Sequence, residues 1–150
     1  MMSRAQVLYL HASVLVLTVT GAAFAFMKYW LKSDDPFAVV NHPWQPAMLS
    51  AHVIAAPFAL FAFGWIFGNH IWPAFTGQAP NRTSGIASML LIAPMTLTGY
   101  LLQVTADERV RHWMAVAHWV TSGLFTVSYV AHLLFKPSVA KPPVPERPTD

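Results

Sequence analysis

Two histidines, His118 and His132, lie in an uncharged stretch that spans residues 112–135. They are fourteen residues apart, close to four turns of an α-helix, so both rings project from nearly the same face. About 21 Å of helix rise separates them, which places one near each surface of a hydrocarbon core about 30 Å thick. Imidazole is a good ligand for iron, and this spacing is what one helix needs to ligate two stacked haems. The alternative interpretation is that both histidines only hydrogen-bond neighbouring helices.

The composition is that of a membrane protein. Of 150 residues, 55% are hydrophobic and 10% are charged, whereas soluble domains average about 25% charged residues. Residues 5–27, 83–106 and 112–135 carry no charge, and each stretch is long enough to span a bilayer. A fourth helix is expected from Ala47 to Gly68. Because four such helices have too little polar sequence to cover a soluble surface, the sequence predicts an all-α integral membrane four-helix bundle with four transmembrane helices.

The chain contains no cysteine. This excludes disulfides, thiolate-ligated iron–sulfur clusters and the covalent attachment of c-type haem. Any haem would therefore be of the b type, held without covalent bonds. The net charge of +3 comes mostly from residues that flank the spans, which favours anionic lipid headgroups over nucleic acid as a partner.

The two ends of the chain require separate interpretations. We expect one haem-binding domain over residues 1–135 and a Pro-rich, disordered tail over residues 136–150. The first apolar stretch could be a secretory signal, because Ala23-Phe24-Ala25 resembles a cleavage site, but its length and His11 favour a retained helix. Lys and Arg residues number five on the side of the termini and four on the other. This count barely favours both termini in the cytoplasm, and we expect a multi-pass protein of the inner membrane.

Four histidines fall into two pairs when alternate helices run in opposite directions. His11, early in the first helix, lies at the depth of His132, late in the last helix. His52, early in the second helix, lies at the depth of His118. Cofactor sites in helical bundles are built from facing helices, so we predict two haems with these four histidines as axial iron ligands. We expect the remaining histidines at the membrane interface; they are His42, His70 and His112. Of these, His112 competes with His118 as a ligand.

The order of one histidine in the first helix, one in the second and two in the fourth resembles the bacterial cytochrome b561 family of four-helix di-haem membrane proteins. The resemblance covers roughly Leu8 to Phe135. It implies the same pairing, His11 with His132 and His52 with His118. It also implies electron transfer from quinol at one face, through two haems, to a partner protein at the other face. A quinone site and assembly into a homo-oligomer or a larger complex belong to the same expectation.

Two other classes of function remain open. One is a haem-bearing membrane anchor subunit of a larger redox complex, which the small size and the tail fit. The other is a cofactor-free membrane scaffold or carrier, whose histidines bind protons or a metal. A visible absorption spectrum separates both haem interpretations from the scaffold.

Overall fold

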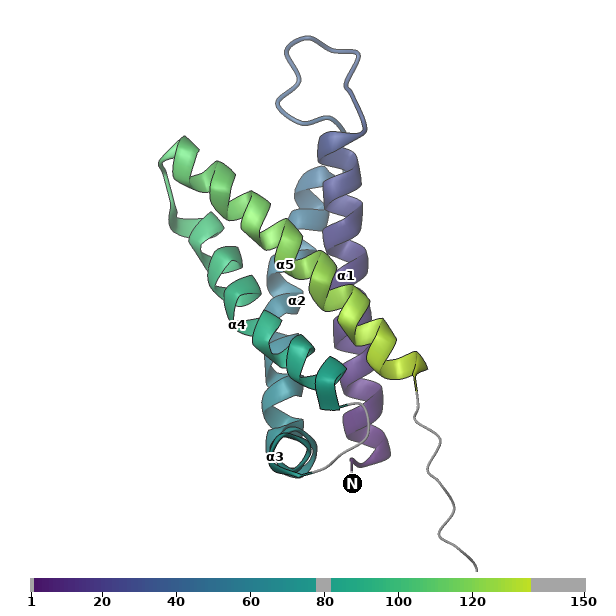
Figure 1. Ribbon diagram of the computed structural model, residues 1–150. Helices are drawn as coiled ribbons and strands as arrows, with labels where there is room; N and C mark the ends of the chain where they lie inside the picture. Colours follow the sequence, from purple (N-terminus) through teal and green to yellow (C-terminus); the bar gives the residue numbers. More distant parts are fainter. Residues whose placement is uncertain (1, 78–81, 136–150) are drawn as a thin grey trace, which may run out of the picture. The chain divides into compact units, whose positions relative to one another are not determined.

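The structure is a computed structural model that describes residues 2–77 and 82–135, with only the backbone of Arg82 (Figure 1). Its elements are α1 (Arg4–Tyr29), α2 (Gln45–Ile66), the π-helical segment η1 (Phe67–Ile71), α3 (Trp72–Thr76), α4 (Arg82–Val104) and α5 (Glu108–Leu134). Four helical segments are long and apolar enough to cross a membrane: Arg4–Tyr29, Gln45–Thr76, Thr83–Val104 and Glu108–Leu134. The prediction of an all-α, multi-pass membrane protein with four transmembrane helices is therefore confirmed.

The described residues divide into two compact units, the first of which ends at Gly77. In the first, the N-terminal hairpin, α1 packs antiparallel against α2 (Figure 1). Their interface uses one stripe of buried side chains from each helix, all of them apolar except that of Gln6. The buried positions are Gln6, Leu10, Val14 and Ala25 on α1, and Ala55, Ala59, Ala62 and Ile66 on α2. The alanines allow the two backbones to approach closely, as small residues do between membrane helices.

The second unit, the C-terminal hairpin, consists of α4 and α5, which also run antiparallel (Figure 1). Ser88, Ile92 and Thr98 of α4 are buried, as is Phe125 of α5. His118, Phe125 and His132 follow one another at intervals of seven residues, which keeps all three on one face of α5. The histidine-bearing face of α5 is thus the face that contributes to the helix interface.

Two helix boundaries differ from the sequence-based expectation. The last uncharged stretch begins at residue 112, but α5 already begins at Glu108, because the Asp107 carboxylate caps it by accepting the Val110 N–H at 2.9 Å. The second helix does not end near Gly68: it continues through η1 into α3, so His70 lies inside a continuous helical segment. The predicted tail, residues 136–150, lies outside the described residues.

Polar contacts explain the π-helical segment. The buried Gln6 side chain donates from its Nε2 to the Trp65 carbonyl at 3.1 Å, and its Oε1 accepts from Asn69 Nδ2 at 3.0 Å. Both partners lie in or beside η1. The Gln6 side chain thus provides hydrogen-bond partners for the Trp65 carbonyl and the Asn69 side chain. These groups lie where the α-helical hydrogen bonds of α2 are replaced by the wider π-helical pattern of η1.

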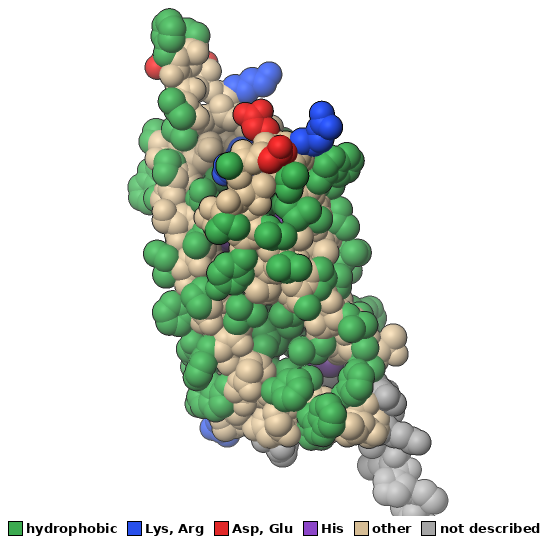
Figure 2. All heavy atoms as spheres, turned by 90° about the vertical axis from the view of Figure 1, so that its left-hand side faces the viewer, with side chains coloured by type: hydrophobic (Ala, Val, Ile, Leu, Met, Phe, Trp, Pro, Cys, Tyr) green, Lys and Arg blue, Asp and Glu red, His purple; other side chains and the backbone are tan. Residues whose placement is uncertain are grey.

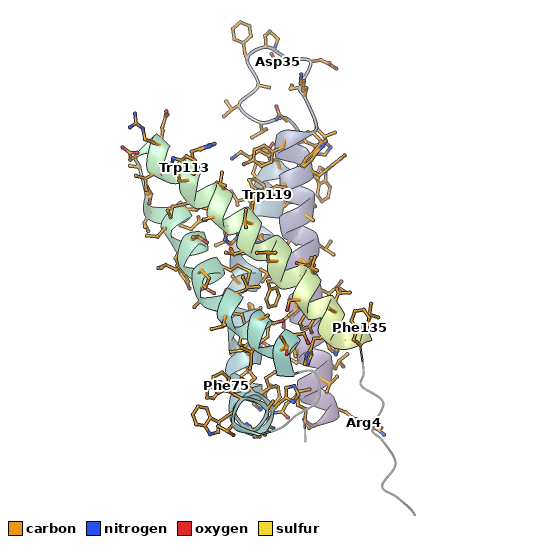
Figure 3. All side chains as sticks on the ribbon, in the orientation of Figure 1. Arg4, Asp35, Phe75, Trp113, Trp119 and Phe135 are labelled. Carbon is orange, nitrogen blue, oxygen red and sulfur yellow. The ribbon has the colours of Figure 1, made fainter. Side chains whose placement is uncertain are left out.

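The surface is suited to lipid. Figure 2 shows hydrophobic side chains along the length of the helices, with Lys, Arg, Asp and Glu side chains at the helix ends. Aromatic side chains gather near the helix ends as well, among them Phe75, Trp113 and Phe135 in Figure 3. Aromatic rings at the ends of apolar helices are typical of the two membrane–water interfaces. These features fit a lipid membrane as the environment of both hairpins.

Candidate functional site

His52 is held in place by α1. Its Nδ1 lies 2.9 Å from the main-chain carbonyl oxygen of Leu17. A carbonyl oxygen only accepts, so the imidazole Nδ1–H must be the donor in this bond. The ring also lies directly against Gly21, where an added Cβ would stand 2.7 Å from Cε1 of His52. Position 21 therefore accepts only glycine unless the imidazole of His52 moves away from α1.

His118 repeats the arrangement in the C-terminal hairpin. Its Nδ1 lies 2.9 Å from the carbonyl oxygen of Met95 and 3.2 Å from the hydroxyl of Thr98. A Cβ on Gly99 would stand 3.1 Å from Cε1 of His118. Gly99 follows Met95 by four residues, just as Gly21 follows Leu17. A helical carbonyl points toward the residue four positions later, so a glycine there leaves its oxygen open to an approaching imidazole.

His132 lies against α4 in a related but different way. A Cβ on Gly85 would stand 3.3 Å from its Cε1, while its Nδ1 lies 3.1 Å from the hydroxyl oxygen of Ser84. The main-chain carbonyl of Ser84 in turn accepts from the hydroxyls of Ser88 at 2.9 Å and Ser128 at 3.0 Å. The imidazole of His132 thus contacts a side-chain hydroxyl of α4.

His11 completes the predicted set and is half-buried in α1. It precedes Gly21, against which His52 lies, by ten residues, or about 15 Å of helix rise. His118 and His132 are about 21 Å apart by the same measure along the unbroken α5. The two separations differ by about 6 Å, and both are far too long for the two histidines of one hairpin to share one iron. Each predicted pair takes one histidine from each hairpin, and the pairing stays a prediction.

The three other histidines have different surroundings. His42 lies in the loop between α1 and α2, where its Nδ1 accepts the main-chain N–H of Trp44 at 3.2 Å. His112 is exposed near the start of α5 and makes an edge-on contact with the Trp113 ring at 5.7 Å. His70 is half-buried in η1. None of these arrangements repeats the contact of a ring with a glycine of the facing helix that His52, His118 and His132 share.

The hydrogen bonds of His52 and His118 define which nitrogen can act as a ligand. With the proton on Nδ1, the neutral imidazole keeps the lone pair on Nε2. Histidines that bind metals usually donate their other N–H to a carbonyl, carboxylate or water, which fixes the tautomer and the ring orientation. Among the residues described, no group of three or more His, Cys, Asp or Glu side chains could hold a metal ion.

Glycines are the part of this site that the analysis of the histidines did not include. Gly99 allows close approach to His118. Gly21 and Gly85 each lie in an apolar helix, where glycine lowers helix stability, and this is the signal that could have drawn attention to them. Gly64 and Gly68 have the spacing of a small-residue packing face, but a Cβ on either would meet no described atom within 4 Å. The alanine stripe of α2 makes the contact with α1 instead.

Comparisons with protein-family models, with curated proteins and with solved structures found no match for this chain.

Proposed function

We propose that this protein is a transmembrane di-haem b-type cytochrome that moves electrons across the membrane. One centre is formed by His52 and His118, the other by His11 and His132. The observation that carries the proposal is that His52 and His118, the two histidines assigned to one iron, make the same two contacts with the facing helix. In both, Nδ1 donates to a helical carbonyl and the ring lies on a glycine four residues further along that helix.

These two contacts, the hydrogen bond from Nδ1 and the packing of the ring on a glycine, suit an axial ligand. The carbonyl holds the proton on Nδ1 and so presents the basic Nε2 to a metal. The contact with the glycine holds the ring close to the facing helix of the same hairpin. A histidine that merely satisfied its hydrogen bonds in a helix interface would not need both constraints at the corresponding positions of two separate hairpins.

Haem would supply reversible one-electron redox chemistry, and the chain would supply the iron ligands, their orientation and an apolar environment. The four histidines bind the irons, the glycines and carbonyls orient the imidazoles, and the apolar helices keep water away. About 21 Å of α5 between His118 and His132 keeps the two centres distinct while carrying both on one rigid element. Two centres at different depths allow an electron to cross a core about 30 Å thick in shorter steps.

The finer features of the proposal follow from the family resemblance. Quinol is the proposed electron source and a redox protein the proposed acceptor. We place the protein in the inner membrane with both termini in the cytoplasm, on the small excess of Lys and Arg on that side. Arg109 and Arg111, in the first turn of α5, are candidates for binding propionates or a quinone headgroup at one face.

Vesicles test this proposal. Full-length protein is reconstituted into phosphatidylethanolamine–phosphatidylglycerol vesicles that contain trapped ferricyanide, and duroquinol is added outside. Each quinol oxidised to quinone releases two electrons and two protons, so two ferricyanide ions inside are reduced and their absorbance falls. His118→Ala and His132→Ala each remove one centre and should reduce the rate to that of protein-free vesicles. Equal rates for these variants and the wild-type protein would contradict the proposal.

A second candidate, the haem-bearing anchor subunit, is favoured by one specific observation. In the loop between α1 and α2, Phe37 is 89% exposed and Val39 is 98% exposed. These two side chains offer apolar surface outside the membrane helices that a catalytic subunit would cover. If the protein is an anchor, Phe37→Ser with Val39→Ser should lower the mass of the complex extracted from its native membrane while haem content is unchanged. An unchanged mass would leave the independent cytochrome as the better description.

A further inference from the structure

The chain changes direction after α2. In Figure 1, α2 is seen from the side and α3 is seen end-on at its foot, so α3 lies across the axis of α2. The π-helical segment η1 separates the two helices, and π-helical turns are a recognised cause of sharp bends. Because α2, η1 and α3 belong to the same compact unit, the bend is a property of the N-terminal hairpin itself.

The length of α2 is sufficient to cross a membrane without η1 and α3. Its 22 residues correspond to about 33 Å of helix, which exceeds the thickness of a hydrocarbon core of about 30 Å. The segments η1 and α3 add five residues each. In a straight helix they would carry the chain about 15 Å further along the axis of α2. The bend instead keeps α3 close to the depth at which α2 ends.

The start of α1 marks the depth of the bend. The Gln6 side chain accepts at Oε1 from the main-chain N–H of Ser3 at 2.9 Å and from Asn69 Nδ2 at 3.0 Å, so one amide joins the beginning of α1 to η1. Arg4, the first residue of α1, is exposed, and its charge requires headgroups or water around it. The segment η1 therefore lies at the edge of the hydrocarbon core. Figure 3 shows Arg4 and Phe75 of α3 at the same end of this hairpin.

The aromatic patch, which we define as Phe67, Trp72 and Phe75, lies at this edge. The ring of Trp72 stacks on that of Phe75 with centroids 6.4 Å apart, and its centroid lies 6.2 Å from that of Phe67. The three side chains are 46%, 55% and 49% exposed, in chain order. Residues 66–77 contain no Lys, Arg, Asp or Glu, and the Thr76 hydroxyl donates to the Trp72 carbonyl at 3.0 Å. The patch is thus apolar surface without a charged side chain from its own segment.

We propose that α3 is an interfacial anchor, which lies along the membrane surface with the aromatic patch in the lipid headgroup layer. Lipid is the partner that this chemistry fits. The indole of Trp72 suits the boundary between headgroups and acyl chains, and Phe67 and Phe75 add apolar surface beside it. The helical segment Gln45–Thr76 is then a transmembrane helix followed by a part that lies on the membrane. The Gln6 amide, which binds η1, holds the bend between the two parts.

The depth of α3 can be measured with a spin label, because the chain contains no cysteine. Thr76→Cys places a single nitroxide at an exposed position of α3, and Ser33→Cys places one in the exposed loop between α1 and α2. Full-length protein is reconstituted into phosphatidylethanolamine–phosphatidylglycerol vesicles. Electron paramagnetic resonance then gives the collision rates of the label with oxygen, which concentrates in lipid, and with a water-soluble nickel chelate. Phospholipids labelled at the headgroup or along the acyl chain calibrate the depth.

The label at position 76 should lie at the depth of the lipid headgroups, with a nickel collision rate several-fold below that at position 33. Adding Trp72→Ser with Phe75→Ser removes the stacked pair of the aromatic patch, so the nickel collision rate should rise to that at position 33. The matched control is Phe26→Ser with Trp30→Ser. It removes a stacked pair, also with centroids 6.4 Å apart, near the other end of α1 and should leave the rate at position 76 unchanged.

Every other outcome would overturn the anchor. A label at position 76 that collides with nickel as often as the label at position 33 would place α3 in water. A label at the depth of the acyl-chain centre would place α3 inside the core, and protection from both oxygen and nickel would show that protein covers it. No change on removal of the stacked pair would show that the aromatic patch does not hold α3 at the membrane. If that variant does not accumulate, the depth measured in Thr76→Cys alone decides.

Discussion

Replacing Gly21 by alanine is the sharpest perturbation of the proposed haem ligation, because it adds one methyl group beside His52. The new Cβ would stand 2.7 Å from Cε1 and 2.9 Å from Nδ1 of the imidazole. Carbon and nitrogen atoms that are not bonded do not approach this closely. The ring must therefore move away from α1 and give up its hydrogen bond with the Leu17 carbonyl.

The size of the effect can be worked out from these contacts. Loss of the hydrogen bond costs about 1 kcal/mol, and forcing a methyl group into a packed site costs about 1–3 kcal/mol. Alanine offsets about 0.5–1 kcal/mol of this, because it favours the helix more than glycine does. The net effect on the free energy of folding is about 2 kcal/mol. The part that concerns haem is the lost hydrogen bond of the ligand, about 1 kcal/mol, which corresponds to about a fivefold weaker affinity for the haem that His52 binds, since 1.4 kcal/mol is a factor of ten.

The assay is the rate of haem transfer from detergent-solubilised protein to an excess of a haem-scavenging protein. Gly21→Ala should lose one of two haems faster than the wild-type protein and keep the other. Gly99→Ala and Gly85→Ala should have smaller effects, because their Cβ atoms would stand 3.1 Å and 3.3 Å from the nearest imidazole atoms. Gly64→Ala is the control, since its Cβ would meet no described atom within 4 Å. Wild-type haem retention in Gly21→Ala, or a reversed order of the three variants, would refute the reasoning.

Three further predictions concern ligands, the membrane and the π-helical segment. His118→Ala should lose the same haem as His52→Ala, and His132→Ala the same haem as His11→Ala, which spectra and haem content of the single variants would show. His42→Ala and His112→Ala should keep both haems, and loss of either one would contradict the assignment. The protein should stay in the membrane fraction after an alkaline carbonate wash, and its release would disprove the transmembrane fold. Gln6→Leu removes the hydrogen bonds that the Gln6 side chain makes with the Trp65 carbonyl and with Asn69. The free energy of unfolding in detergent should therefore fall by about 1–3 kcal/mol. An unchanged midpoint of thermal unfolding would show that these hydrogen bonds do not stabilise the hairpin.

The sequence predicted the membrane helices because the signal is long and local. Each uncharged stretch exceeds the thickness of the hydrocarbon core, so no distant contact can change its assignment. Helix ends were predicted less well. The last uncharged stretch begins only at residue 112, but the charged residues before it extend α5 into water, because Asp107 caps the helix. The length of the uncharged stretch defines the membrane span and not the helix.

The π-helical segment was beyond sequence reasoning because its cause is remote. Gln6 and Asn69 are sixty-three residues apart, and nothing in the local sequence of η1 indicates that a side chain from α1 will bind there. The contacts between histidine rings and glycines could be predicted only in part. A glycine in an apolar helix has several explanations until the register with the facing helix is known, and Gly21 matches His52 only in that register. The assignment of the four histidines as iron ligands rests on residue type and spacing, and both this assignment and their pairing across hairpins stay predictions.

The most direct test of the central claim is the number of haems that each chain binds. Full-length protein is purified from membranes of cells supplied with a haem precursor, and its haem is quantified as the pyridine haemochrome against protein determined by amino-acid analysis. The proposed ligation by His11, His52, His118 and His132 predicts two non-covalent b-type haems per chain, with a dithionite-reduced minus oxidised spectrum typical of low-spin, six-coordinate iron. One haem per chain would contradict the two-centre arrangement, and none would contradict the cytochrome itself.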